Sequence, residues 1–364
     1  MFNGARILVA PLDWGLGHAS RCVPIIRALL EHGAMPVIGA DKGPLALLRE
    51  EFPQLDHVRI PGMEVRYAKG RSQAWAMAKQ FPAMLRQVRK EHVLFEKIRH
   101  EFRLDVVISD QRFGMRSAGL PSVLVTHQLF PFAPFAQGFA RRINRRHIDR
   151  FDLCWVPDHE EAPGLSGALS HEVNMPANAR FIGPLSRFAG ERSAADGPKY
   201  RVVAVISGPE PQRSLLESAV RFQLKKIEGS HLIISGKPGS DDVREGNIRT
   251  MGHLNSDALH AAMKNAVLII GRTGYSTLMD LDAIGRGALL VPTPGQAEQE
   301  YLGRLHHAAG VHRIQEQHRL DISAVLADPP PSFPPKQNSS AFLPALYELA
   351  RLIALRRNTI PTSA

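Results

Sequence analysis

The feature that most restricts the fold of this chain is an alternation of short apolar runs, glycine-containing loops and helix-like stretches. Residues 5–11 form an apolar run, Gly15 and Gly17 follow it, and residues 20–30 carry apolar side chains at helical spacing. The same order returns at three further apolar runs, 35–40, 104–109 and 122–126. Such runs, separated by helices, are typical of a parallel sheet that is buried on both faces. The first half therefore predicts a doubly wound α/β domain.

A polar stretch interrupts this alternation near the middle of the chain. Residues 184–200 are rich in glycine, proline and small side chains and show no periodicity, so we interpret them as a linker. Beyond them the alternation restarts, with strands predicted at 201–207, 231–235, 267–270 and 288–291 and helices at 213–225, 257–264, 278–284 and 296–307. The predicted units are a first Rossmann-like domain at 1–183 and a second one at 201–328.

The last part of the chain, 329–364, has a different composition. Five of the seven residues from 329 to 335 are proline, which excludes a helix there. Residues 342–356 are helical in composition, and we expect this helix to cross back over the domain junction.

The charge distribution points to an anionic partner for the first domain. The chain has 364 residues and 45 Lys and Arg against 35 Asp and Glu, a net charge of +10. The whole excess lies in two segments, 66–103 and 137–150. The alternative is that the excess serves solubility alone.

The cysteine content indicates a reducing compartment. Cys22 and Cys154 are the only cysteines, so neither a disulfide framework nor a cysteine-based zinc site can form, and we expect a cytoplasmic location. No stretch reaches the ~18 apolar residues of a membrane span.

Three predicted strand-to-helix loops are candidate phosphate sites, at 13–18, 207–213 and 271–277. Ligands of open parallel sheets bind where such loops lead into helix N-termini. The first loop lacks the third glycine of a dinucleotide fingerprint, and none has the Walker pattern. Each glycine could instead serve packing alone.

Taken in order, these loops resemble those of the GT-B glycosyltransferases, and most closely family 28, which includes the bacterial N-acetylglucosaminyl transferase of the peptidoglycan lipid precursor. Residues 271–281 followed by 291–301 resemble the donor-binding signature of that family. The resemblance implies two Rossmann-like domains that face a cleft, with an acceptor-side first domain and a nucleotide-sugar-binding second domain.

The resemblance also implies donor-binding residues. It places the diphosphate on Thr273, Gly274, Tyr275 and Ser276, the ribose on Asp280, and the sugar on Glu298 and Gln299. Further residues implied on the donor side are Gly208 and Arg213 of the second loop, His253 and Leu254 over the uracil, and Gln296.

The implied reaction is transfer of N-acetylglucosamine or a similar hexose from a UDP-sugar to an anionic or lipid-linked acceptor, with inversion. We expect no metal and no cofactor besides the UDP-sugar, because helix N-termini and arginine supply positive field and no histidine-rich cluster occurs.

His18 is the predicted general base, since a histidine with an ordinary pKa of about 6.5 is largely neutral at neutral pH. Asp110, which follows the predicted strand at 104–109, would orient it. Gly15, Gly17 and His127 are assigned to the acceptor side. Two alternatives stay open: His18 binds an acceptor phosphate or caps its helix, or His127 is the base.

Two segments of the first domain suggest contact with an anionic membrane. Residues 82–102 form an apolar helix stripe with basic residues around it, and the aromatic segment 130–135 precedes the arginine-rich segment 141–150. We therefore expect the protein to lie peripherally on the inner face of the cell membrane, although core packing also explains such a stripe.

Two other functions compete with glycosyl transfer. A UDP-sugar epimerase of the same fold would need no acceptor. A nucleic-acid binder would explain the net charge, but the basic segments lack interleaved stacking aromatics and no helix-turn-helix or zinc-finger pattern appears. We therefore expect no nucleic-acid partner.

Overall fold

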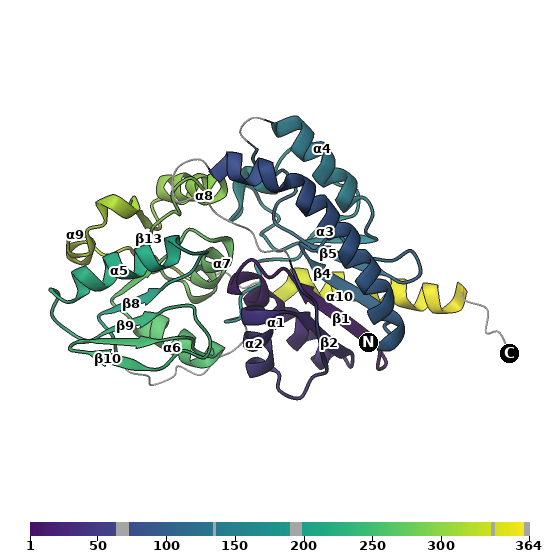
Figure 1. The fold of residues 1–364 in the computed structure, drawn as a ribbon, viewed down its shortest axis with the longest axis horizontal. Helices are drawn as coiled ribbons and strands as arrows, with labels where there is room; N and C mark the ends of the chain where they lie inside the picture. The colour runs from purple at the N-terminus through teal and green to yellow at the C-terminus, as the bar shows by residue number, and fades with distance from the viewer. Residues whose placement is uncertain (63–72, 134–135, 190–198, 336–338, 360–364) are drawn as a thin grey trace.

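The computed structural model describes residues 1–62, 73–133, 136–189, 199–335 and 339–359. Within them the chain forms two seven-stranded sheets, each flanked by helices (Figure 1). Most of the predicted linker, the start of the first basic segment, and Pro134 and Phe135 of the aromatic segment lie outside the described residues.

The first sheet has the strand order β3-β2-β1-β4-β5-β6-β7, and all its described pairings are parallel. Its strands are β1 (Arg6–Pro11), β2 (Met35–Ala40), β3 (His57–Arg59), β4 (Val106–Asp110), β5 (Ser122–Val125), β6 (Leu153–Val156) and β7 (Ala179–Phe181). The helices are α1 (Leu16–Glu31), α2 (Lys42–Glu51), α3 (Gln73–Glu101) and α4 (Gln137–Ile148), with a 3₁₀ turn at Gly167–Leu169.

Alternation along the strands divides the core of this domain between two faces. Ile7 and Val9 of β1 join the cluster that includes α1 and α2, whereas Leu8 and Ala10 join the cluster that includes Phe95 of α3. Because successive side chains of a strand point to opposite faces, a fully apolar run needs helices on both sides.

The second sheet has the order β10-β11-β9-β8-β12-β13-β14, in which only β10 pairs antiparallel among the described strands. Its strands are β8 (Val202–Val205), β9 (His231–Ile234), β10 (Val243–Glu245), β11 (Ile248–Met251), β12 (Leu268–Gly271), β13 (Leu289–Leu290) and β14 (Arg313–Ile314). The helices are α5 (Gln212–Leu224), α6 (Ser256–Asn265), α7 (Tyr275–Ile284), α8 (Ala297–Ala308) and α9 (Ile322–Ala327), with a 3₁₀ turn at Gln317–Arg319.

The C-terminal helix α10 (Ser339–Thr359) returns to the first domain, which confirms the predicted crossing (Figure 1). Leu349 and Ile353 are buried against that domain, and Arg356 donates to Asp152 at 3.0 Å. Arg357 donates to Asp105 at 2.8 Å.

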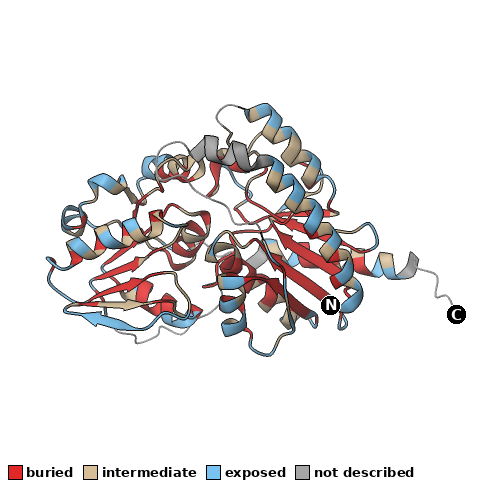
Figure 2. Ribbon diagram, in the orientation of Figure 1, coloured by how far each residue is buried: buried red, intermediate tan, exposed pale blue. Residues whose placement is uncertain are grey.

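The predicted fold class, two Rossmann-like doubly wound domains, is confirmed. Figure 2 shows the reason: the central strands are buried, while many helical residues alternate between buried and exposed. The prediction missed β6 and several short outer strands. Of these, β10 is exposed along its whole length, so it carries no apolar run that a sequence could reveal. The domain boundaries stay predictions.

Candidate active site

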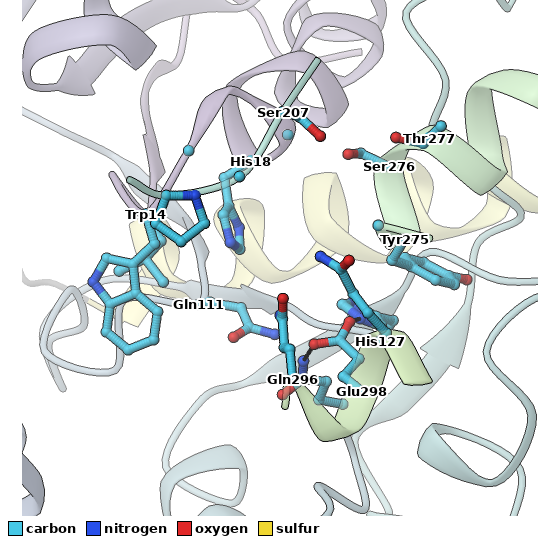
Figure 3. A pocket seen from close by; sticks show the side chains of 18 of the residues that line it. Trp14, His18, Gln111, His127, Ser207, Tyr275, Ser276, Thr277, Gln296 and Glu298 are labelled. Carbon is cyan, nitrogen blue, oxygen red and sulfur yellow. Dashed lines mark hydrogen bonds and ion pairs between the residues drawn. The ribbon is translucent and has the colours of Figure 1, made fainter. Parts of the chain in front are cut away.

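A cavity of about 1660 Å³ lies between the two domains and is lined by loops that follow β1, β5, β8 and β12. The carboxyl ends of both parallel sheets therefore open toward the same space, as ligand sites of such sheets do. Figure 3 shows His18 of α1 on one side of this space and Ser276 and Thr277 of α7 on another.

Most of the residues predicted from the sequence meet in this cavity. Those that line it are Gly15, Gly17, His18, His127, Gly208, His253, Gly274, Tyr275, Ser276, Asp280, Gln296, Glu298 and Gln299. Four predicted residues lie outside the lining: Asp110, Arg213, Leu254 and Thr273.

The start of α7 can hold an anion on the cavity wall. Gly274 is the N-cap of α7, and the first helical hydrogen bond runs from the Leu278 N–H to the Gly274 carbonyl. The N–H groups of residues 275–277 therefore have no intrahelical acceptor, and they sit at the positive end of the helix. Ser276 and Thr277 add side-chain hydroxyls on the cavity wall.

Thr273 supports this turn from behind. It is fully buried, and its hydroxyl donates to the Gln299 carbonyl at 2.8 Å. The Gln299 side chain in turn accepts from the Thr293 N–H at 2.9 Å. The two halves of the donor-binding signature, although some 20 residues apart, are thus tied to each other.

On the opposite side of the cavity, a cluster of ionisable groups lies around the first turns of α1. His18 Nδ1 lies 2.9 Å from Asp110 Oδ1, and Asp110 is the last residue of β4. Arg21, one turn further along α1, donates through both Nε and Nη2 to the Asp110 carboxylate. Asp110 is fully buried, whereas the His18 side chain is one-fifth exposed to the cavity.

The pKa values of this cluster follow from its burial and its charges. Burial alone would raise the pKa of the Asp110 carboxyl, but the neighbouring Arg21 and His18 outweigh it and lower that pKa well below its ordinary value. Burial lowers the pKa of His18; Asp110 opposes this shift, while Arg21 and His127 add to it. His18 is therefore held neutral at neutral pH.

His127, which follows β5, connects the two domains. Its Nδ1 lies 3.2 Å from Arg21 Nη1, and its Nε2 lies 2.8 Å from Glu298 Oε1 at the start of α8. Its ring stacks on Tyr275 with 3.9 Å between centroids. Gln128 donates to the other Glu298 oxygen at 2.6 Å. Figure 3 shows His127 and Glu298 pointing toward one another.

Asp280 of α7 is held by the segment that follows the first sheet. The Ser186 hydroxyl donates to Asp280 Oδ1 at 2.6 Å, and Arg187 Nε lies 3.6 Å from Oδ2. About a tenth of the Asp280 side chain is exposed. The predicted ribose acceptor therefore has protein partners at both oxygens, and it still borders the cavity.

The other donor-side residues have mainly local partners. Arg213 Nη2 donates to Glu210 at 2.7 Å, and Nη1 donates to the Gly236 carbonyl at 3.0 Å. Leu254 packs against the main core cluster. His253 is mostly buried, and this burial, with the nearby Arg187 charge, lowers its pKa to about 4.

The first-domain side of the cavity continues into an apolar region. It is lined by Phe113, Phe132, Phe139, Ile143 and His147, which come from α4 and the loops around it. His147 stacks on Phe113 with 4.8 Å between centroids. Phe113 and His147 were not predicted from the sequence.

Three polar residues of the first domain were also not predicted from the sequence: Arg21, Gln111 and Gln128. All three line the cavity. The spacing of Arg21 from His18 was a usable signal, because residues three apart on a helix share a face. Gln111 and Gln128 follow directly on Asp110 and His127, at strand ends where ligands bind.

Within the described part of the chain, no group of three or more His, Cys, Asp or Glu side chains could hold a metal ion. The expectation of a metal-independent reaction without cofactor stays a prediction.

Comparison with known proteins connects the second domain to one family. Residues 204–328 match the family model described as the glycosyltransferase family 28 C-terminal domain. This match confirms the resemblance inferred from the loops.

Two curated relatives are named as N-acetylglucosamine transferases. A UDP-N-acetylglucosamine–N-acetylmuramyl-(pentapeptide) pyrophosphoryl-undecaprenol N-acetylglucosamine transferase of Rhodopseudomonas palustris (strain BisB5) is 33% identical over 108 residues, which span 27% of this chain and 28% of that protein. A protein of the same name from Prochlorococcus marinus (strain MIT 9211) is 21% identical over 324 residues, covering 88% of this chain and 85% of the relative.

Solved structures share the complete fold at low identity. The spinosyn rhamnosyltransferase SpnG has a TM-score of 0.61 at 18% identity and covers 96% of both chains. CalG4, the calicheamicin glycosyltransferase, has a TM-score of 0.58 at 13% identity and covers 97% of this chain and 95% of its own. SpnG complexed with thymidine diphosphate has a TM-score of 0.55 at 17% identity, covering 97% and 95%. The fold is that of the GT-B glycosyltransferases.

Proposed function

We propose that this protein is an inverting, metal-independent glycosyltransferase that moves N-acetylglucosamine or a similar hexose from a UDP-sugar to an anionic or lipid-linked acceptor. The observation that carries the proposal is the shared cavity, in which a neutral histidine of one domain faces free helix N–H groups of the other. The first can take a proton, and the second can hold a departing diphosphate.

The donor diphosphate binds at the start of α7. The N–H groups of residues 275–277 and the hydroxyls of Ser276 and Thr277 supply hydrogen bonds there, and the helix dipole favours negative charge. Ser207 and Gly208 face the same space from the loop after β8. The choice of uridine is supported by the relatives' names and by the position of His253 on the cavity wall.

In the transfer step, a hydroxyl of the acceptor attacks the anomeric carbon of the donor sugar from the face opposite the diphosphate. The bond between that carbon and the diphosphate oxygen breaks, and the stereochemistry inverts. His18 takes the hydroxyl proton, and Asp110 orients the imidazole through Nδ1. The N–H groups at the start of α7 stabilise the negative charge on the leaving UDP.

The alternative in which His18 caps its own helix finds no support, because the N-cap of α1 is Gly15 and makes no side-chain cap bond. An acceptor phosphate that contacts His18 would raise the pKa of the imidazole, whereas burial and Arg21 lower it and favour the neutral, basic form.

Glu298 and Gln299 are proposed to select the sugar. The Glu298 carboxylate already accepts hydrogen bonds from His127 and Gln128. Sugar hydroxyls therefore bind Glu298 beside these two residues or replace them, which couples sugar binding to contact between the domains.

The acceptor enters from the first domain. The apolar region around Phe113 and Phe139 suits an apolar part of the acceptor, and Phe139 is itself 61% exposed. Arg142 and Arg146 are exposed on the same helix α4, whereas Arg141 and Arg145 are paired with Glu172 and Asp149. We infer that α4 rests on anionic lipid at the cytoplasmic face of the membrane.

The apolar stripe of α3 lies partly in the core and partly at the surface. Phe95 and Ile98 are core residues, while Leu85 is 39% exposed and borders the cavity. None of the helices in the described ranges has the length and apolar composition to span a bilayer.

Membrane contact is tested by sedimentation with vesicles that contain anionic phospholipid. The Phe139→Ser, Arg142→Gln, Arg146→Gln triple variant should lose most of the bound fraction. The Arg221→Gln variant on α5 is the matched control and should bind as the wild type does. Equal binding of the triple variant and the wild type would contradict this part of the proposal.

The reaction is tested by a thermal-stability screen with nucleoside diphosphates and their sugar conjugates, followed by product analysis with and without acceptor. A ligand at 100 times its Kd stabilises the native state by about 2.7 kcal/mol. We expect the largest stabilisation from one UDP-sugar and product only when acceptor is present. Epimerised or free sugar without acceptor would indicate the epimerase. Binding of random DNA with no response to any UDP-sugar would indicate the nucleic-acid binder.

A further inference from the structure

Arg21 is buried beside the proposed base, and the role inferred for it below rests on the proposed transfer reaction. Only 3% of the Arg21 side chain is exposed, at the centre of the ionisable cluster. Its guanidinium lies within hydrogen-bond distance of Asp110, His18 and His127. An arginine is a donor at every nitrogen and accepts nowhere, so it dictates the proton positions of its neighbours.

The tautomer of His127 follows from this rule. Its Nδ1 lies 3.2 Å from Arg21 Nη1, so Nδ1 must be the acceptor and carry no proton. The proton of the neutral ring is then on Nε2, which lies 2.8 Å from Glu298 Oε1 and donates to it. Both ring nitrogens of His127 are occupied, and His127 is left without a basic site for an acceptor hydroxyl.

His18 has the opposite arrangement. Arg21 holds both oxygens of Asp110, and Asp110 Oδ1 also lies 2.9 Å from His18 Nδ1. A proton on Nδ1 makes a charge-assisted hydrogen bond to this carboxylate, and it leaves Nε2 unprotonated. Nη2 of Arg21 is also 2.9 Å from His18 Nδ1, so the carboxylate and the guanidinium compete for this nitrogen: with a proton Nδ1 donates to Asp110, and without one it accepts from Arg21.

We propose that Arg21 is a positioning residue that fixes His127 with Nε2–H directed to Glu298 and, by holding both oxygens of Asp110, supports the His18 tautomer with Nδ1–H and a basic Nε2. The guanidinium thereby excludes His127 as the base and leaves His18. The charged and titratable groups facing His18 are Asp110 from β4, Arg21 from its own helix and His127 after β5, with Glu298 from α8 behind His127.

The first test is ¹⁵N NMR of the histidine ring nitrogens in the full-length protein, with assignments from His18→Gln and His127→Gln. We expect the protonated nitrogen to be Nδ1 in His18 and Nε2 in His127. In Arg21→Met, His127 should become a mixture of tautomers. A wild-type His18 protonated at Nε2 would overturn the proposal.

The second test is steady-state kinetics of Arg21→Met and Arg21→Lys, with Arg59→Lys as a control from another Arg–Asp pair in the same domain. Arg21→Met should reduce kcat by about 100-fold, with little change in the KM for the donor, because a general base contributes roughly 10²–10⁴-fold. The acid limb of kcat/KM should move to higher pH, since the removed positive charge had lowered the pKa of His18. Arg21→Lys should lower kcat and keep the acid limb near its wild-type position.

A purely structural Arg21 would lower thermal stability without moving the acid limb or the tautomers, and that result would overturn the proposal. If Arg21→Met does not fold, Arg21→Lys and the wild-type spectrum decide the question. If the wild type transfers no sugar, the proposed function fails, while the NMR measurement still decides the role of Arg21.

Discussion

The two walls of the cavity are built from different chemistry. The first domain contributes ionisable side chains, His18, Arg21 and Asp110, whose protons depend on one another. The second domain contributes mostly backbone N–H groups and hydroxyls at the start of α7, which carry no titratable proton near neutral pH. This difference separates two tasks: one wall can move a proton, and the other can hold a phosphate at any pH near neutrality.

This difference between the walls predicts that substitutions in the first wall change kcat, whereas substitutions in the second wall change the affinity for the donor. The largest effect is expected for His18→Gln. It should lower kcat by about 10²–10⁴-fold, because the general base is lost, and leave the Kd for UDP unchanged. Steady-state rates and UDP titration calorimetry measure the two quantities.

The matched control for His18→Gln is His57→Gln, an exposed histidine of β3. It should behave as the wild type. A loss of UDP affinity in His18→Gln that parallels its loss of rate would break the division between the two walls.

A second variant tests how closely the two walls approach. A Cβ added to Gly17 would lie 2.5 Å from the Ser276 hydroxyl oxygen and 3.2 Å from its Cβ, so Gly17→Ala must displace the Ser276 side chain or the start of α1. Overpacking of this kind costs about 1–3 kcal/mol. We expect kcat/KM for the UDP-sugar to fall by roughly 10-fold or more.

Gly138→Ala is the control for this steric effect, because a Cβ at Gly138 meets no atom within 4 Å. It lies in α4 and should leave kcat/KM unchanged. An active Gly17→Ala with wild-type kcat/KM would show that the two helix starts need not meet.

Low pH should destabilise the second domain, because it contains buried histidines that are neutral in the native state. Burial lowers the pKa of His253 to about 4 and, together with the nearby His306, that of His312 to about 3. Below pH 6.5 the unfolded chain binds more protons at these positions than the native one, so the free energy of unfolding falls as the pH falls. For His312 the loss between pH 7.5 and pH 5 should be about 1–2 kcal/mol.

Urea unfolding of the wild type and of His312→Gln at these two pH values measures the effect. The variant should show a smaller difference between the two pH values than the wild type. An equal difference in both proteins would mean that His312 does not carry the acid sensitivity.

The smallest effect is expected for Glu298→Gln, which keeps the shape of the side chain and removes its charge. The hydrogen bond from His127 loses its charge assistance, worth about 1 kcal/mol. The KM for the UDP-sugar should rise several-fold, and the Kd for UDP alone should not change, because the affected contact serves the sugar.

Glu217→Gln on α5, which pairs with Arg221 there, is the control and should leave both constants unchanged. A fall in UDP affinity in Glu298→Gln would place that residue at the diphosphate instead of the sugar.

The sequence was sufficient for the central strands and for the loops that follow them. Strands such as β2 and β9 carry contiguous apolar residues, and glycines mark the turns into α1 and α7. The edge strands were not predictable, because β3 and β10 are short and mostly exposed and owe their extended form to pairing with a neighbour.

The sequence predicted which loops form the site, but not which of their side chains contact one another. The contacts of Asp110 with Arg21, of His127 with Glu298 and of Asp280 with Ser186 join residues 89, 171 and 94 positions apart. Local spacing does not encode these contacts, since the first depends on how α1 packs beside β4 and the second on how the two domains are placed relative to each other. The spacing of Arg21 from His18 indicated a shared helix face, but the contacts of Arg21 with Asp110 and His127 emerged only from the structure.

The most direct test of the account is a crystal structure of the protein with bound UDP. The diphosphate should lie within hydrogen-bond distance of the N–H groups of residues 275–277, on the side of the cavity that faces His18. Diphosphate bound at another place on the second domain, or a vacant α7 turn at saturating UDP, would contradict it.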